Sequence, residues 1–427
     1  MKPIARHAGA ALALLLVFPL AVAALTVNTN FTPQVRLGFT VGDQWEPAIA
    51  ADGSRHIYVL YPQYGRIPDC ESCALPSMTL VVSGDNGETW QAPREISPHI
   101  TGQFDAQIVV DPLDRRTVYA AWLQNRNTDA IVAKSVDFGQ SWSIVIADRG
   151  SQDADKPILA VRGPNIYLAF NRSRRIRVAA SHDGGITFTS TDVDPSAGLV
   201  RALAGGATVD IDDNVHVAWA GYRRKDGAKG RVNLYTSSSS DGGNTWTSHL
   251  MDSSGAPPEC SAYQCERGYL GAQITLASDE AGTLYALWNA GVGDKAAERI
   301  YFASSTTAGA IWSPKAPVSR APFGVEHAFP ALVAGEAGDV RIAWMDTRSG
   351  LWNTYYRSSS NGGATWSPEI RVSSFVPGYR YIRAKGFSFP FGDYFEMDID
   401  SEGRTQAVWG EGLNFRSPGS IWYSSGR

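Results

Sequence analysis

One eight-residue pattern recurs along this chain, and its spacing limits the fold more than any other feature. The fullest copies, such as "SSDGGNTW", read Ser-x-Asp-x-Gly-x-Thr-Trp. Six copies, one of them degraded to "STTAGAIW", begin at Ser83, Ser135, Ser181, Ser239, Ser305 and Ser359. Successive copies start 46 to 66 residues apart, which is the length of one four-stranded propeller blade with its connections. The repeat therefore predicts a ring of small antiparallel sheets.

A second repeated motif gives the number of blades. It is a Gly or Asp turn followed by an alternating strand that ends on an aromatic residue. The seven aromatic positions are Tyr61, Trp122, Phe170, Trp219, Trp288, Trp344 and Trp409. The seventh copy is followed by "GSIWYSSGR", which lacks an outer strand. We expect the segment "LTVN" at residues 25–28 to supply that strand and to close a seven-bladed ring.

The fold class follows from the residues around these motifs. Apolar residues at helical spacing are not found after residue 24, whereas short alternating strands are frequent. In each box the Asp can accept hydrogen bonds from backbone N–H groups two or three residues on, and the Gly can take the positive φ of the turn. The closing Trp or Phe can fill the gap between neighbouring sheets. We predict an all-β fold in which the box is a folding device, the alternative being a calcium or sugar site at each Asp.

The first 24 residues are typical of a secretory signal peptide. Lys2, Arg6 and His7 precede an apolar run that ends in the small-residue pattern Ala-Val-Ala at 21–23. A retained membrane helix is the alternative, but Pro19 interrupts a run shorter than the about 20 residues that a span needs. We expect an exported protein, secreted or periplasmic, with residues 25–427 forming one propeller domain and no membrane span.

Charge excludes one class of partner. The predicted cleavage removes two of 38 basic residues and no acid, which leaves 36 basic against 42 acidic side chains. A basic stripe that could bind a phosphate backbone is missing, so we do not expect nucleic acid as a partner. Neither a heptad pattern nor a long apolar edge indicates an oligomer, and we expect a monomer.

The four cysteines fall in two close pairs, Cys70 with Cys73 and Cys260 with Cys265. In an oxidising compartment such pairs predict two local disulfides that hold long loops. The alternative is a zinc ion held by all four thiolates, because two of the spacings suit it. We expect neither a cofactor nor a catalytic metal, the alternative being structural calcium.

At these repeats the chain resembles the Asp-box proteins, also called bacterial neuraminidase repeat proteins. Their signature is Ser-x-Asp-x-Gly-x-Thr-Trp, and their best-known members are the sialidases. The resemblance covers residues 25–427 and implies a β-propeller of sialidase type. Because sialidases have six blades, a six-bladed ring is the alternative to the seven counted here. The same box occurs in propellers with other functions, so it predicts the fold more strongly than the activity.

We expect the binding site on the face of the ring opposite the boxes. The boxes join the third and fourth strands of a blade, so the loops between second and third strands and the crossovers between blades share the other face. The substrate-binding candidates on those loops are Asp43, Arg66, Arg201, Arg267, His327, Arg348 and Asp393. Arg can bind a carboxylate with two parallel hydrogen bonds. The set therefore favours a glycan or acidic sugar as ligand, the alternative being ordinary charged surface loops.

The resemblance also implies catalytic roles, because "YFEMDIDSEGRTQAVWGEG" is similar to a sialidase stretch that opens on a Tyr nucleophile. On that match Tyr394 attacks the anomeric carbon, an acidic neighbour takes its proton, and Glu411 is the acid after the next strand. Arg348 stands where sialidases keep one of three substrate-carboxylate arginines, and Asp69 is the candidate general acid. The sequence departs from the family where its Arg-Ile-Pro lies between second and third strands, and where the carboxylate partner of the tyrosine falls near Gln273.

Three functions are consistent with these residues. The first is an exported exo-glycosidase that acts on acidic sugars by a retaining mechanism. The second is a non-catalytic propeller that binds a glycan or a partner protein, with Tyr394 packing over the channel. The third is a polysaccharide lyase in which Tyr394 or His327 abstracts a proton next to a uronate carboxylate.

Overall fold

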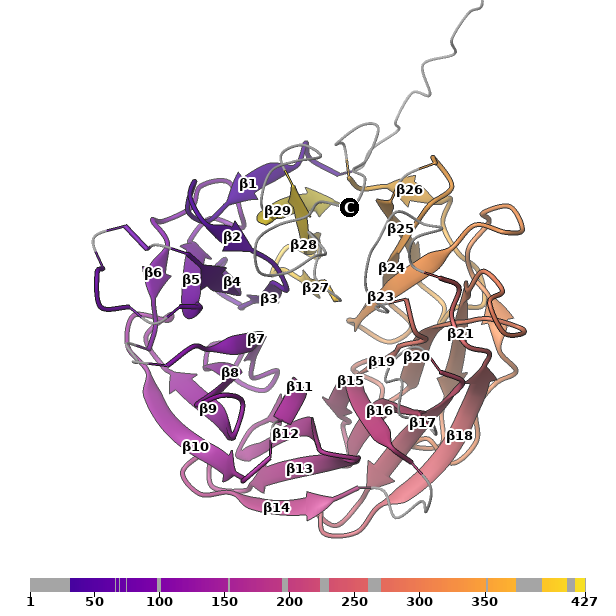
Figure 1. Cartoon of the computed structure of the whole chain (residues 1–427), viewed down its shortest axis with the longest axis horizontal. Coiled ribbons are helices and arrows are strands. Elements are labelled where there is room, and N and C mark those ends of the chain that lie inside the picture. The colour runs from indigo at the N-terminus through magenta and orange to yellow at the C-terminus, as the bar shows by residue number, and fades with distance from the viewer. Residues whose placement is uncertain are drawn as a thin grey trace, which may run out of the picture.

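Seven sheets stand in a ring around a central axis in the computed structural model, as Figure 1 shows. The structure describes residues 31–65, 67–68, 70–73, 75–97, 101–152, 154–193, 199–222, 230–259, 270–350, 352–373, 394–412 and 419–426. In these ranges the chain forms strands and turns, and none of it forms a helix that could cross a membrane. The all-β, seven-bladed prediction is confirmed, and the six-bladed alternative is wrong. The signal peptide predicted at residues 1–24 lies outside the described residues.

Each blade is an antiparallel meander whose first strand is the innermost. Blade 1 contains β2 (Asp43–Gln44), β3 (Ala48–Ala51), β4 (Ile57–Tyr64), β5 (Ser77–Ser83) and β6 (Arg94–Glu95), with its first strand split in two. Blade 2 contains β7 (Phe104–Val110), β8 (Val118–Gln124), β9 (Asp129–Ser135) and β10 (Ser143–Arg149). Blade 3 contains β11 (Ala154–Arg162), β12 (Asn165–Arg172), β13 (Arg175–Ser181) and β14 (Thr189–Asp192).

The remaining four blades follow in chain order. Blade 4 contains β15 (Arg201–Val209), β16 (Val215–Tyr222), β17 (Val232–Ser239) and β18 (Thr247–Ser254). Blade 5 contains β19 (Ile274–Ser278), β20 (Leu284–Ala290), β21 (Arg299–Ser305) and β22 (Ala316–Pro317). Blade 6 contains β23 (His327–Ala334), β24 (Val340–Asp346), β25 (Asn353–Ser359) and β26 (Ile370–Arg371). Blade 7 contains β27 (Glu396–Ile399), β28 (Thr405–Gly412), β29 (Gly419–Gly426) and β1 (Val35–Leu37).

The strand β1 closes the ring by completing the last blade. It pairs antiparallel with β29, where Leu37 lies opposite Ile421, and Phe31 forms a further bridge to Gly426. Leu37 is buried with Ile421 in the core between blades 7 and 1, and burial of this side chain fixes the register. Closure by an N-terminal strand is confirmed with Val35–Leu37 as the strand, while the predicted segment at residues 25–28 lies outside the described residues.

The core lies between the blades rather than within one of them. The aromatic residues of the second motif are all at most 1% exposed. Trp122 of blade 2, for example, packs in one cluster with Leu60 and Leu80 of blade 1. Burying such a side chain stabilises the fold by about 2–3 kcal/mol, and the ring repeats this contact at each junction. The alternation predicted from the sequence therefore supplies the packing between sheets.

The boxes form the turns between third and fourth strands. Ser239 donates its hydroxyl to Asp241 at 2.8 Å and accepts from the Gly243 N–H at 2.9 Å. The Asp241 carboxylate accepts from the N–H groups of Asn244 and Thr245, three and four residues on, and from the Thr245 hydroxyl. These bonds lower the pKa of Asp241 to about 2. Gly243 has a φ of +85°, as expected. The turn thus uses both carboxylate oxygens itself, which supports the interpretation of the box as a folding device.

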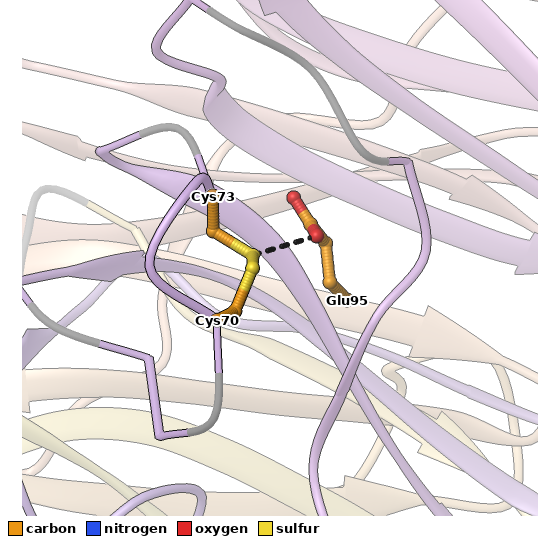
Figure 2. Close-up of side chains that lie close together, drawn as sticks. All are labelled: Cys70, Cys73 and Glu95. Carbon is orange, nitrogen blue, oxygen red and sulfur yellow. Dashed lines mark hydrogen bonds between the residues drawn. A yellow bond between two sulfur atoms is a disulfide. The ribbon is translucent and has the colours of Figure 1, made fainter.

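One of the two predicted disulfides lies in the described part of the chain and is confirmed. Cys70 and Cys73 are joined in the loop between β4 and β5 (Figure 2). Two of the four sulfurs are therefore bonded to each other, which excludes a zinc ion held by four thiolates in this state. Cys260 and Cys265 lie outside the described residues.

Candidate functional site

A cavity of about 590 Å³ occupies the axis of the ring. Residues of the innermost strands of all seven blades line it, and much of its wall is aliphatic. Polar groups enter it from blades 2, 3, 4, 5 and 7, and those of blades 2, 3 and 7 include Gln107, Lys156, Tyr394, Glu396 and Asp398. Of the predicted site residues that the structure describes, Tyr394 alone lines this cavity. Four other predicted residues, Arg66, Asp69, Arg267 and Asp393, lie outside the described residues.

Tyr394 reaches across the mouth of the cavity. It lies two residues before β27 in blade 7, yet its hydroxyl donates a long hydrogen bond of 3.5 Å to the carbonyl oxygen of Ala106 in blade 2. Lys156 of blade 3 places Nζ 5.3 Å from the centre of the tyrosine ring. Since blades 2 and 3 are not sheet neighbours of blade 7, the tyrosine spans the axial opening. An ammonium over a ring face is attracted by the electrons of that face, so the pair forms a cationic, aromatic platform.

Two acids follow Tyr394 on β27. Glu396 accepts from Nε2 of Gln107 at 2.6 Å and from the Ile49 N–H at 3.2 Å, and Asp398 accepts from the N–H of residue 51 at 2.7 Å. Burial raises the pKa of Glu396 to about 8 and that of Asp398 to about 6. Glu396 is therefore mainly uncharged at neutral pH. The sequence reasoning missed both acids, although the alternation Glu-Met-Asp-Ile in an innermost strand was the available signal.

Arg201 lies at the same mouth, at the start of the innermost strand of blade 4. Its guanidinium is 2.7 Å from the carboxylate of Asp155, and its side chain is 43% exposed. Asp155 directly precedes Lys156 on β11, so the ion pair stands beside the Lys156–Tyr394 pair. Arg201 thus pairs with the residue that precedes Lys156, and Lys156 contacts Tyr394. The lysine is not among the candidates predicted from the sequence.

The backbone at this mouth is unusual in several blades. Glu46, Asp105, Lys156 and Phe329 have φ values of +51°, +57°, +52° and +55°. The pairing register shifts beside the last three of these residues, in the first strands of blades 2, 3 and 6. Non-glycine residues rarely adopt this conformation, and such bulges change the direction of a side chain. Left-handed residues of this kind are concentrated at functional sites.

Arg348, the predicted carboxylate-binding arginine, already has carboxylate partners. Its Nε and Nη2 lie 3.0 and 2.6 Å from Asp346, and its Nη1 contacts Glu369. Nη2 also donates to Ser319 at 3.1 Å, and the guanidinium lies 4.0 Å from the Tyr355 ring centre. Hydrogen bonds to these two acids raise the pKa of Arg348 despite its burial. The group therefore serves as a link within blade 6 rather than as an open anion site.

His327 and Asp43 are also buried and hydrogen-bonded. The His327 Nδ1 lies 2.8 Å from the carbonyl oxygen of Glu298, its Nε2 lies 2.8 Å from Ser319 Oγ, and the residue is 1% exposed. Burial lowers the pKa of His327. Asp43 accepts from the Gly419 N–H at 2.6 Å and so connects blade 1 to blade 7. Burial raises the pKa of Asp43 to about 6. Both side chains hold blades together and do not line the cavity.

Glu411 has a partner inside its own blade. It is 2% exposed and accepts from the indole N–H of Trp409 at 2.9 Å. Gln124 accepts from Trp122 in blade 2 in the same way at 3.1 Å, and blade 6 repeats the arrangement with an Asp. An acceptor two residues after the buried tryptophan therefore satisfies an indole N–H that would otherwise lack a partner. This role accounts for Glu411 without catalysis.

Sequence comparison identifies one family. The profile of the BNR repeat-like domain matches residues 40–264, just over half of the 427-residue chain. A search of curated proteins finds no significant match. Among solved structures, a protein of unknown function from Dyadobacter fermentans has a TM-score of 0.52 at 15% identity, with 93% of this chain and 98% of that chain covered.

Two further solved structures are similar in fold. An ulvan lyase of a new polysaccharide lyase family, bound to -[GlcA(1-4)Rha3S]-, has a TM-score of 0.51 at 11% identity, with 91% of this chain and 95% of that chain covered. A Hadza microbial sialidase has a TM-score of 0.46 at 14% identity, with 90% and 66% covered. The two matches with TM-scores above 0.5 show a shared fold, and function has to be argued from the site.

Proposed function

The chain belongs to the BNR repeat-like domain family, and from that premise we propose that it is an exported propeller that binds an acidic glycan at the mouth of its central cavity. The observation that carries this proposal is the contact between the Tyr394 ring and Lys156 across the mouth, beside the Arg201–Asp155 ion pair. Export rests on the N-terminal signal pattern, and the disulfide in blade 1 is compatible with it.

The chemistry of the mouth matches the two surfaces of an acidic sugar. Such a sugar presents an apolar C–H face, which can stack on the ring of Tyr394, and a carboxylate or sulfate group. The ammonium of Lys156 supplies positive charge over the ring. Arg201 is half exposed but already pairs with Asp155, so a ligand carboxylate would have to share it. The volume of about 590 Å³ and the largely aliphatic wall fall within the range of small-ligand sites.

Binding is favoured over hydrolysis because, among the described residues, two groups that a retaining mechanism would use are already engaged. A tyrosine nucleophile needs a base, but burial raises the pKa of Glu396, the acid two residues on, to about 8, which favours its protonated form at neutral pH. Its oxygens also accept from Gln107 and Ile49. Arg348, which would hold a substrate carboxylate, is neutralised by its own acids.

A glycan array followed by calorimetry tests the proposal. The parent is expected to bind sialylated or uronate-containing glycans more tightly than their neutral counterparts. Tyr394→Ala, which removes the platform, should weaken binding by about tenfold. Tyr394→Phe keeps the ring and should bind more tightly than Tyr394→Ala. Lys156→Met should reduce the preference for acidic over neutral glycans.

Lys134→Met is the matched control. Lys134 places Nζ 5.4 Å from the Tyr119 ring, a similar contact at the box end of blade 2 and outside the cavity. Its loss should leave glycan binding unchanged. A blank array, or equal effects of Lys156→Met and Lys134→Met, would contradict the proposed site. Turnover of a sialoside reporter that disappears in Tyr394→Phe would instead establish the glycosidase alternative.

A further inference from the structure

The loop between β4 and β5 carries a disulfide that touches a carboxyl group. Between Cys70 and Cys73 lie Glu71 and Ser72, which are exposed, and the two cysteines are partly exposed. Glu95 places Oε2 2.9 Å from the Sγ of Cys73, as Figure 2 shows. A thiol reagent can therefore reach the loop from solvent, while the acid approaches from the sheet side.

Glu95 is held in place by the blade rather than by the loop. It lies on β6, where it pairs with Thr79 of β5. On the described residues of β5, β6 and their connection to β4, the other charged groups are Glu71 and Arg94. Arg94 donates to the carbonyl oxygen of Gly139 at 2.7 Å. The sheet therefore holds the backbone of Glu95 beside the loop that carries the disulfide.

The short contact between Glu95 and Cys73 requires a proton on one of the two groups, whether the cysteines are oxidised or reduced. A disulfide sulfur has no hydrogen to donate, so a carboxylate at 2.9 Å would place two acceptors against each other. A protonated Glu95 can donate O–H to the sulfur, and a reduced Cys73 can donate S–H to the carboxylate. Burial raises the pKa of Glu95, against a hydrogen bond from Ser77. The contact therefore favours a proton on the acid when the sulfurs are bonded and on the sulfur when they are not.

We propose that Cys70–Cys73 is a redox-active disulfide, opened by a dithiol, in which Glu95 delivers the proton to the leaving sulfur. A thiolate of the dithiol attacks Sγ of Cys70 and forms a mixed disulfide. The electron pair of the broken S–S bond passes to Sγ of Cys73, which takes the proton of Glu95. The second thiolate of the dithiol then attacks the reagent sulfur of the mixed disulfide. This step closes the oxidised reagent and releases the Cys70 thiolate. Cys70 is protonated by water.

This proton transfer changes the proton count of the reduction. Two thiols form, but one of their protons comes from Glu95, so the protein takes up one proton from solution for two electrons. Without an ionisable group at residue 95 the protein takes up two. The midpoint potential of the wild-type loop is therefore expected to change with pH half as steeply as that of Glu95→Gln, below the pKa of the thiols.

The test is a redox titration of the full chain with reduced and oxidised dithiothreitol between pH 5 and pH 8, with a chelator present. Alkylation and peptide mass spectrometry follow Cys70 and Cys73 separately from the second cysteine pair. Three proteins are compared: wild type, Glu95→Gln and Glu71→Gln. The last removes an exposed acid from the same loop and should behave as the wild type does. The expected result is a slope for Glu95→Gln twice that of the other two, with slower reduction at pH 5.

Three outcomes would overturn the proposal. Equal slopes for wild type and Glu95→Gln would show that Glu95 only packs against the sulfur. A doubled slope in Glu71→Gln as well would attribute the effect to loop charge. A disulfide that dithiothreitol opens only after the protein unfolds, as judged by circular dichroism, would assign it a purely structural role.

Discussion

Replacing Glu411 with Gln is expected to stabilise the protein, and the gain is expected to grow with pH. Glu411 is 2% exposed, and it accepts hydrogen bonds from the Trp409 indole and from Gln34. A Gln side chain can accept the same bond through its carbonyl oxygen, as Gln124 does from Trp122 in blade 2. The substitution therefore keeps the geometry and removes only the ionisable group.

The size of the gain follows from the pKa of Glu411. Burial raises this pKa to about 8 from 4.5, against hydrogen bonds from Trp409 and Gln34. The unfolded chain loses the proton near pH 4.5 and the folded protein near pH 8, so folding takes up a proton between these values. The contribution of the protonated group is complete below pH 4.5 and is lost as pH rises toward 8. At about 1.4 kcal/mol per unit, the loss is about 3 kcal/mol at pH 7 and about 5 kcal/mol above pH 8.

Urea denaturation at pH 4.5, 7 and 9 measures this effect. The free energy of unfolding of Glu411→Gln should equal that of the wild type at pH 4.5 and exceed it by about 3 kcal/mol at pH 7. Gln124→Glu is the mirror variant in blade 2, because it introduces the acid beside Trp122. It should be destabilised at pH 7 and not at pH 4.5. A difference between Glu411→Gln and wild type that does not vary with pH would refute the reasoning, and so would a less stable Glu411→Gln at pH 7.

Two further predictions concern the ring itself. Ser239→Ala removes the acceptor of the buried Gly243 N–H, so chemical denaturation should show a loss of about 1–3 kcal/mol; an unchanged stability would mean that the box hydroxyl is dispensable. Deleting residues 31–37 removes β1 and the buried Leu37, which should cost at least about 2 kcal/mol and expose the edge of β29. Light scattering should then detect self-association through that edge, and a monomer of wild-type stability would show that β1 does not close the ring.

The fold could be predicted because its signals are local. The bonds of each box lie within one turn, as those of Ser239 and Asp241 do. The buried aromatics follow a period that the strand geometry dictates. The sequence repeat therefore predicts both the structure of one blade and the number of blades. The closing strand is harder to predict, because local spacing does not indicate which N-terminal segment packs at the junction between the first and last blades.

The site could not be predicted in the same way because its contacts join distant parts of the chain. Tyr394 and Ala106 are 288 residues apart, and Glu396 and Gln107 are 289 apart. Similarly, the neutralisation of Arg348 by Glu369 depends on how blade 6 folds. No spacing in the sequence encodes such pairs, since they form only when seven sheets surround one axis.

Comparison between blades would have separated some structural acids from site residues. An acceptor two residues after the buried tryptophan recurs in blades 2, 6 and 7, as Gln124, Asp346 and Glu411. A polar residue that returns at an equivalent position in several blades is explained by the fold that the blades share. The family resemblance predicts a catalytic role for Glu411, whereas the repetition of the same hydrogen bond in three blades indicates a structural one.

The mouth of the cavity shows the opposite pattern, and this difference supports placing the ligand there. Glu46, Asp105 and Tyr394 each stand six residues before the Asp of the next turn, at Asp52, Asp111 and Asp400. The first two share a left-handed backbone, so the scaffold is repeated. Their side chains, however, are two different acids and a tyrosine. A position that keeps its place in the blade but varies its chemistry around the ring is not explained by the shared fold alone, and it gives the mouth the asymmetry that the proposed binding of an acidic sugar would require.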